Sequence, residues 1–127
     1  MKTFFSIFFL SLLAVVAGCS KKVSVEGRVT FPDGAPLTVG TVVFEMDHYQ
    51  VVGPLDQDGR YRLGEIRPGD GVLRGRYGVR VHAETGGTSD GAPIVKYVAP
   101  KYENTETSEL SCEIKGKTVF DFTVERP

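Results

Sequence analysis

The feature that most constrains the fold is an alternation of apolar and polar side chains that begins at Val23 and recurs along the chain. Residues two apart in a strand share a face, so this period of two predicts strands with one dry face and one wet face. No segment shows the period of a helix, which predicts an all-β chain. The inward positions we expect are Val25, Gly27, Val29 and Phe31, then Val42, Phe44 and Met46, then Tyr61 and Leu63, then Tyr77, Val79 and Val81, then Phe120, Phe122 and Val124.

Turn signals separate these strands about every 8–12 residues, which is the spacing of a β-sandwich of about seven strands. In Pro32-Asp33-Gly34, proline presets φ and glycine accepts a left-handed backbone. The short Lys115-Gly116-Lys117 link predicts a hairpin between residues 110–114 and 118–124. Residues 83–109 carry no clear pattern, and we expect a long, mostly irregular loop, which is often a functional segment.

The first eighteen residues carry the signals of secretion in the required order. Lys2 is followed by a greasy run over residues 4–16, then by small residues and Cys19. The run is shorter than the roughly 20 residues that cross a bilayer as a helix. We therefore predict that residues 1–18 are a signal peptide, cleaved between Gly18 and Cys19.

Val16-Ala17-Gly18-Cys19 resembles the lipobox of bacterial lipoproteins. The resemblance implies that the Cys19 thiol is joined to diacylglycerol and that the new amino end is acylated, with chains such as palmitate. Buried acyl chains contribute about 0.8 kcal/mol per CH₂, which makes a stable membrane anchor. Ser20, where Asp would favour the inner membrane, favours the outer membrane. An ordinary signal peptide with a chance cysteine, or a buried N-terminal helix, is the alternative.

The remaining chain divides into a lipid-anchored start over residues 19–22 and one domain over residues 23–127, which is long enough for its own core. With 15 basic and 16 acidic side chains in all, the chain has no electrostatic footprint for nucleic acid. Cys112 is the only other cysteine and shares the apolar face of its strand with Ile114. We expect it to be buried, the alternative being a reactive thiol.

Two patterns in the sequence are candidates for metal sites. Asp56-Gln57-Asp58-Gly59 begins like a calcium loop, but its fifth and twelfth positions are Arg60 and Arg67, where oxygen ligands are needed. His48 and His82 are the only histidines, and no set of ligands accompanies either at the spacing of a zinc site. The sequence therefore predicts no metal and no other cofactor.

Several segments resemble carboxypeptidase-regulatory-like domains. The opening matches are Val25-Glu26-Gly27-Arg28-Val29-Thr30, Asp33-Gly34-Ala35-Pro36-Leu37 and Gly40-Thr41-Val42-Val43-Phe44. The middle strands match at Asp58-Gly59-Arg60-Tyr61-Arg62-Leu63 and Gly75-Arg76-Tyr77-Gly78-Val79-Arg80-Val81. Pro100-Lys101-Tyr102, Thr107-Ser108-Glu109-Leu110 and Phe120-Asp121-Phe122 are similar to the tail of small lipoproteins of this type, common in planctomycetes. The resemblance implies a transthyretin-like (prealbumin-like) sandwich of seven strands in two sheets.

The same resemblance implies no catalytic activity, because such domains serve mostly as accessory or cell-surface modules. We expect a non-enzymatic envelope module that binds a protein or a polysaccharide through its loops. Aromatic and cationic residues of the long loop offer one such surface, although its tyrosines can instead pack against the sandwich edge; they are Lys96, Tyr97, Lys101 and Tyr102. The alternative function is a small envelope hydrolase using His48 or His82, which convergence of the two histidines with a carboxylate in one cleft would favour.

Overall fold

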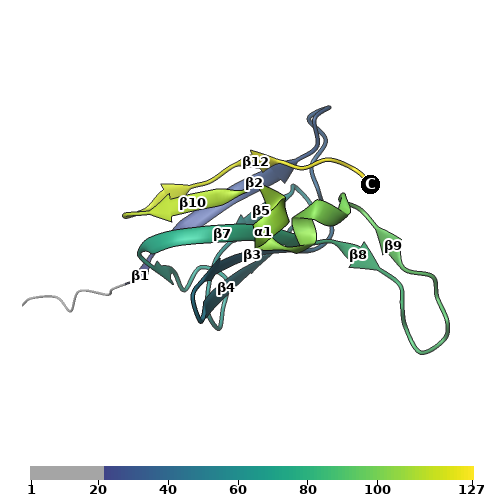
Figure 1. Ribbon diagram of the computed structural model, residues 1–127, viewed down its shortest axis with the longest axis horizontal. Coiled ribbons are helices and arrows are strands. Elements are labelled where there is room, and N and C mark those ends of the chain that lie inside the picture. Colours follow the sequence, from purple (N-terminus) through teal and green to yellow (C-terminus); the bar gives the residue numbers. More distant parts are fainter. Residues whose placement is uncertain (1–21) are drawn as a thin grey trace, which may run out of the picture.

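The computed structural model describes residues 22–127, and Figure 1 shows them as an assembly of sheets with little helix. The strands are β1 (Lys22–Val23), β2 (Val25–Thr30), β3 (Thr41–Met46), β4 (Tyr49–Pro54), β5 (Arg60–Arg62), β6 (Val72–Leu73), β7 (Gly75–His82), β8 (Glu84–Thr85), β9 (Val95–Lys96), β10 (Ser111–Ile114), β11 (Thr118–Val119) and β12 (Phe122–Thr123). A 3₁₀ helix, η1 (Pro100–Glu103), and one turn of α-helix, α1 (Thr105–Ser108), lie between β9 and β10.

Two main sheets make the sandwich. Sheet I has the order β10-β7-β3-β4, and all its pairs are antiparallel. Sheet II is built on β2, with β5 antiparallel on one side and β11 and β12 parallel on the other. A bridge between Val52 and Gly64 joins the two sheets on the side of β4 and β5. The all-β sandwich is confirmed, whereas the expected number of seven strands is not.

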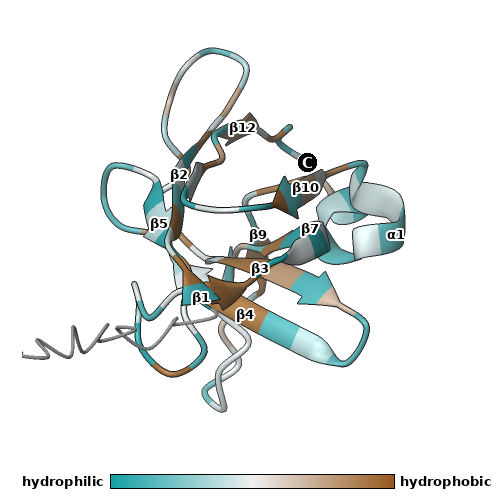
Figure 2. Cartoon of the chain, turned by 90° about the vertical axis from the view of Figure 1, so that its left-hand side faces the viewer, coloured by the Kyte–Doolittle hydropathy of each residue, from teal (hydrophilic) through white to brown (hydrophobic). Residues whose placement is uncertain are grey.

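The core lies between the inner faces of the two sheets, at the positions that the alternation marked. Phe44 sits at its centre, and the rings of Tyr77 and Phe120 are each 5.9 Å from its own ring, with Tyr61 at 6.3 Å. Phe44 and Tyr77 come from sheet I and Tyr61 from sheet II, so aromatic packing joins the two sheets. Figure 2 shows the central residues of β3 and β4 as apolar and most of the loops as polar. The predicted inward face is therefore confirmed, with Met46 and Phe120 partly buried at its margin.

The predicted turn after β2 is confirmed. The Gly34 N–H donates to the Phe31 carbonyl at 2.9 Å, and Gly34 has a φ of 88°. The Asp33 carboxylate accepts the Ala35 N–H at 3.1 Å, which closes the turn from the side-chain side.

The predicted hairpin at the end of the chain is wrong. β10 pairs with β7 in sheet I, whereas β11 and β12 pair with β2 in sheet II. Gly116 does not adopt the positive φ that a tight hairpin turn needs, so the link crosses from one sheet to the other. The last strand is also interrupted, because the Asp121 carboxylate accepts the Arg28 N–H at 2.8 Å and the Phe120 carbonyl accepts the Tyr61 hydroxyl at 2.5 Å.

The segment 83–109 is more regular than expected. β8 and β9 pair as the base of a hairpin, and η1 and α1 follow it. The Ser108 hydroxyl, which is buried, donates to the Val79 carbonyl at 2.6 Å and so fixes α1 on β7. Gly78 makes this approach possible, because a Cβ there would lie 2.9 Å from the Thr105 side chain. Short helices of this kind carry no sequence period, which is why the alternation did not reveal them.

The predicted signal peptide, its cleavage point and the Cys19 lipidation site lie outside the described residues. The described chain starts at β1, which pairs with β6 through Lys22↔Leu73 and Val23↔Val72. The Lys22 ammonium also lies 2.9 Å from the Glu65 carboxylate. Among residues 22–127, no helix has the length and apolar character that crossing a membrane would need.

Candidate functional site

The four residues proposed as an aromatic and cationic surface are not equally available. Tyr102 is only 4% exposed, and its hydroxyl accepts the Glu125 N–H at 3.1 Å. It therefore packs against the sandwich edge, the alternative noted above, and presents no ring to a partner. Lys101 pairs with Glu125 at 3.5 Å and lies over the Tyr102 ring.

The other two members of that set belong to the β8–β9 hairpin. The exposed Lys96 is paired with Glu103 at 2.8 Å, and the hydrogen bond to the Glu103 carboxylate, followed by the charge of that carboxylate, raises the pKa of Lys96. Tyr97 is partly buried, with its hydroxyl 3.3 Å from the Thr85 hydroxyl. These contacts fix the base of the hairpin, and the accessible part of the predicted surface is thus Lys96, with Lys101 and Tyr97 partly exposed.

The two histidines do not converge. His82 lies opposite Thr41 at one end of β3, and His48 lies in the turn that follows the other end. The length of β3 alone separates them by about 17 Å, at roughly 3.3 Å per residue. His82 is exposed and has Glu84 at 3.5 Å, while His48 is exposed in its turn. No shared cleft therefore supports the hydrolase that would use them.

Cys112 faces the core, as predicted. It is 8% exposed and unpaired, and burial raises the pKa of its thiol. A raised thiol pKa leaves less thiolate, which is the nucleophilic form. The structure thus gives Cys112 the environment of a small core residue.

The Asp56 loop is built as a turn. One oxygen of the Asp56 carboxylate accepts the N–H groups of Asp58 and Arg60, at 2.8 and 2.9 Å. These two bonds, that of Arg60 first, lower the pKa of Asp56, and the charges of Arg60 and Arg28 lower it further. Within the described part of the chain, no three His, Cys, Asp or Glu side chains lie together so as to hold a metal ion.

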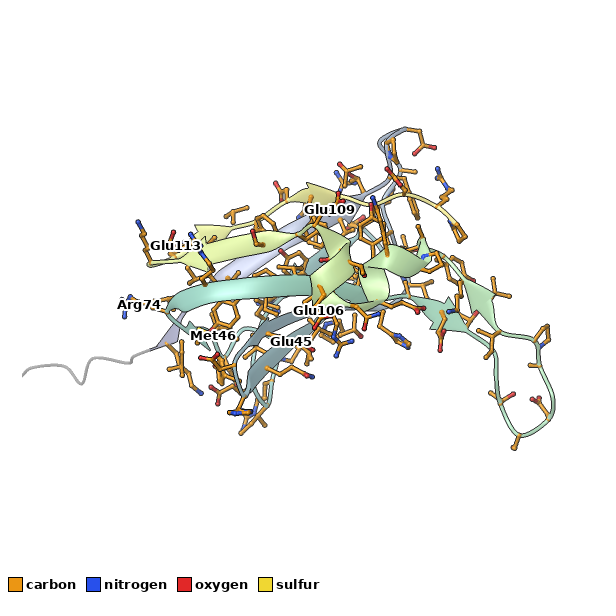
Figure 3. The ribbon with its side chains drawn as sticks, viewed as in Figure 1. Glu45, Met46, Arg74, Glu106, Glu109 and Glu113 are labelled. Carbon is orange, nitrogen blue, oxygen red and sulfur yellow. The ribbon has the colours of Figure 1, made fainter. Side chains whose placement is uncertain are left out.

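The β8–β9 hairpin projects from the sandwich at the end opposite β1. In Figure 1 the longest axis is horizontal, with β1 towards one end and the hairpin loop at the other. Figure 3 places Arg74 and Glu113 near the β1 end. At the hairpin, Ile94 and Val95 are 59% and 47% exposed, although both are large apolar residues. An exposed apolar pair on a projecting loop is a natural contact point for another molecule.

A hollow of about 640 Å³ lies on the outer face of sheet II. We call it the arginine groove, because Arg28 of β2 and Arg60 and Arg62 of β5 line it together. Arg28 stands directly opposite Arg60 in the register, with Glu26 opposite Arg62. The other lining residues are Gly27, Pro54, Asp56, Tyr61, Pro68, Val119 and Asp121.

The arginines of this groove have unusually few partners. Within the described residues, the one hydrogen bond from their guanidinium groups runs from Arg28 Nε to the Asp58 carbonyl, at 2.9 Å. Among residues 22–127, no carboxylate oxygen lies within 4.0 Å of a guanidinium nitrogen of Arg28, Arg60 or Arg62. Two like charges directly opposite each other in a sheet are destabilising. The groove therefore gathers three guanidinium groups that form no ion pair within 4.0 Å with the three carboxylates that also line it, those of Glu26, Asp56 and Asp121.

The sequence reading missed this groove. A signal was present, because Arg28, Arg60 and Arg62 all occupy outward positions of their alternating segments. The sequence does not show the register of β2 with β5, which sets Arg28 opposite Arg60 although they are 32 positions apart in the chain.

No family model matches the chain, and no curated protein matches it. Two solved structures are similar. A DUF3823 family protein from Bacteroides ovatus has 16% identity and a TM-score of 0.46 over 81% of this chain. BcpA, the major pilin subunit of Bacillus cereus, has 9% identity and a TM-score of 0.50 over 84% of this chain. The chain spans only 44% and 30% of those two proteins, and the likeness to the pilin subunit is one of β-sandwich fold alone.

Proposed function

We propose that this chain is a bacterial envelope lipoprotein, anchored by lipid at Cys19, whose sandwich binds a partner through the β8–β9 hairpin. The observation that carries the proposal is the placement of β1 and the hairpin at opposite ends of the molecule. Three residue steps separate Cys19 from Lys22, and an extended chain covers about 11 Å in that distance. A lipid on Cys19 would thus hold the β1 end at the membrane and leave the hairpin facing outward.

The composition of the hairpin favours a protein over a polysaccharide as the partner. Ile94 and Val95 offer apolar area, and Lys96 and Tyr97 continue the same segment with a cation and an aromatic ring. Aromatic and apolar anchors of this kind provide most of the binding energy in protein interfaces. A non-enzymatic role is supported by the separation of His48 from His82.

The anchor is tested by replacing one cysteine at a time. In Cys19→Ala cells we expect no incorporation of labelled palmitate and an unprocessed or soluble product. Cys112→Ala is the matched control and should keep both the label and the membrane association, because Cys112 lies in the sandwich core. Unchanged mass and membrane retention of Cys19→Ala would refute the lipoprotein assignment.

The binding role is tested with two equivalent substitutions at opposite ends of the molecule. Ile94→Asp places a charge on the hairpin, and Ile66→Asp places the same charge near the β1 end, where Ile66 is 87% exposed. Proteins captured with the full-length chain from solubilised membranes should be lost with Ile94→Asp and kept with Ile66→Asp. Equal capture by both variants would remove the hairpin from the proposal.

A further inference from the structure

The geometry points to the arginine groove as a second binding site, which takes an extended peptide segment carrying Asp or Glu at alternate positions. The inference goes beyond the proposed function, because the groove lies on sheet II and its ligand need not be the partner of the hairpin.

The arginines of the groove have N–H donors that the fold does not use. Each guanidinium has five N–H donors in a fixed fork that matches a carboxylate, and it stays charged at all physiological pH values. Arg60 and Arg62 donate none of theirs to another described residue, and Arg28 uses only its Nε, on the Asp58 carbonyl. Most of the donors in the groove are thus available to a ligand.

The spacing of these donors matches the repeat of an extended peptide. Arg60 and Arg62 are two residues apart on β5, so their Cα atoms are about 6.6 Å apart on one face of the strand. An extended peptide has the same repeat, and its side chains two residues apart also share a face. Acidic side chains at alternate positions would therefore meet Arg60 and Arg62 in turn, with Arg28 beside the first of them.

Three carboxylates also line the groove around the arginines. Asp56 and Asp121 each already accept backbone N–H groups, and Glu26 stands opposite Arg62 without an ion pair within 4.0 Å. These three negative charges would repel a dense polyanion that fills the groove. A peptide with charges only at alternate positions can place them over the arginines, which favours it over polyphosphate or an acidic polysaccharide.

The groove also has a suitable size and apolar contacts. Its volume of about 640 Å³ falls within the range of roughly 300–1,000 Å³ that is usual for ligand sites. Pro54, Pro68 and Val119 line it, and Val119 is 62% exposed. These residues can contact the apolar part of a peptide while the arginines hold its carboxylates.

The test uses the full-length protein in mild detergent and a fluorescent peptide of alternating Glu and Ser. We expect saturable binding that weakens as ionic strength rises, because exposed charge interactions are screened by salt. The same peptide with Gln in place of Glu should not bind. The variant Arg60→Gln/Arg62→Gln should bind the Glu peptide at least about tenfold more weakly, since two charge-assisted contacts are lost.

The matched control is Arg76→Gln/Lys115→Gln, which removes the same charge from exposed positions outside the groove lining. It should bind within about twofold of the wild type, whereas an equal loss in both variants would reduce the effect to net charge and overturn the site. Absence of saturable binding to the wild type overturns it as well. Circular dichroism melting of both variants checks that the fold is retained. Displacement of the peptide by polyphosphate or polygalacturonate at lower concentration would assign a different ligand class and overturn the peptide proposal.

Discussion

The outer faces of the two sheets differ in how closely their charged side chains are paired. On sheet I, Arg80 lies 2.6 Å from the Glu45 carboxylate, and Arg76 and His82 also have acidic neighbours. On sheet II, Arg28 faces Arg60 in the register, and no arginine of the groove has an ion pair within residues 22–127. α1 also contacts sheet I at β7, through the Ser108 hydroxyl bond. One face of the sandwich is therefore covered and paired, and the other is open and charged.

The difference shows that surface charge has two distinct roles in this small protein. The pairs on sheet I join neighbouring strands and are satisfied within the fold. The arginines of sheet II form no such pair among residues 22–127, and what they contribute to the fold is the bond from Arg28 to the Asp58 carbonyl and the charge that Arg28 and Arg60 place near Asp56. The inner faces, in contrast, are alike, because both are apolar and carry aromatic side chains.

The largest effect we expect is the loss of sheet II in Gly27→Ala. A Cβ at this position would lie 1.9 Å from the Phe120 carbonyl oxygen and 2.7 Å from the Tyr61 hydroxyl. The backbone would have to separate there, which we expect to reduce the free energy of unfolding by about 3 kcal/mol or more. Urea denaturation followed by circular dichroism measures the change. Gly116→Ala is the control and should be nearly neutral, because nothing lies within 4 Å of its added Cβ.

An alkaline titration tests whether both inner faces bury their tyrosine side chains. Burial raises the pKa of Tyr77 to about 12, and burial followed by the Glu65 hydrogen bond does the same for Tyr49. Burial also raises the pKa of Tyr61 in sheet II. Because an unfolded tyrosine ionises near pH 10, the stability due to these residues is complete below pH 10 and is lost as the pH rises through about 12.

The measurement is tyrosinate absorbance alongside the free energy of unfolding. Part of the absorbance should appear only as the protein unfolds. If all five tyrosines titrate together near pH 10 while the protein stays folded, the tyrosine hydroxyls of the two sheets are not buried.

The smallest effect separates the outer faces directly. Arg80→Gln breaks the close pair with Glu45 and should lower the free energy of unfolding by about 0.5–1 kcal/mol at low salt. Arg60→Gln removes the repulsion from Arg28 but also the attraction to Asp56, so it should change stability less than Arg80→Gln does. Urea denaturation of the two variants at low and high salt measures the difference. If Arg60→Gln were as destabilising as Arg80→Gln, the two outer faces would not differ as we expect.

Part of this architecture could be predicted from the alternation alone. Val29, Phe44 and Val79 were placed on the inner face because a strand presents every second side chain to the same side, whatever it pairs with. The Asp33-Gly34 turn followed from the backbone preference of glycine. The end of the chain was misread because a glycine between two strands predicts a hairpin locally, whereas β10 and β11 belong to different sheets.

The sequence by itself determined the all-β class, the inward face of each strand and the place of Cys112 within the core. These properties depend on residues that are close together in the chain, so local patterns are sufficient. Only the tertiary structure decided that the last strands divide between two sheets, that the β8–β9 hairpin projects opposite β1, and that Arg28 meets Arg60 and Arg62. Each of these depends on strand register over long separations, which follows from how the core packs and not from any short stretch of residues.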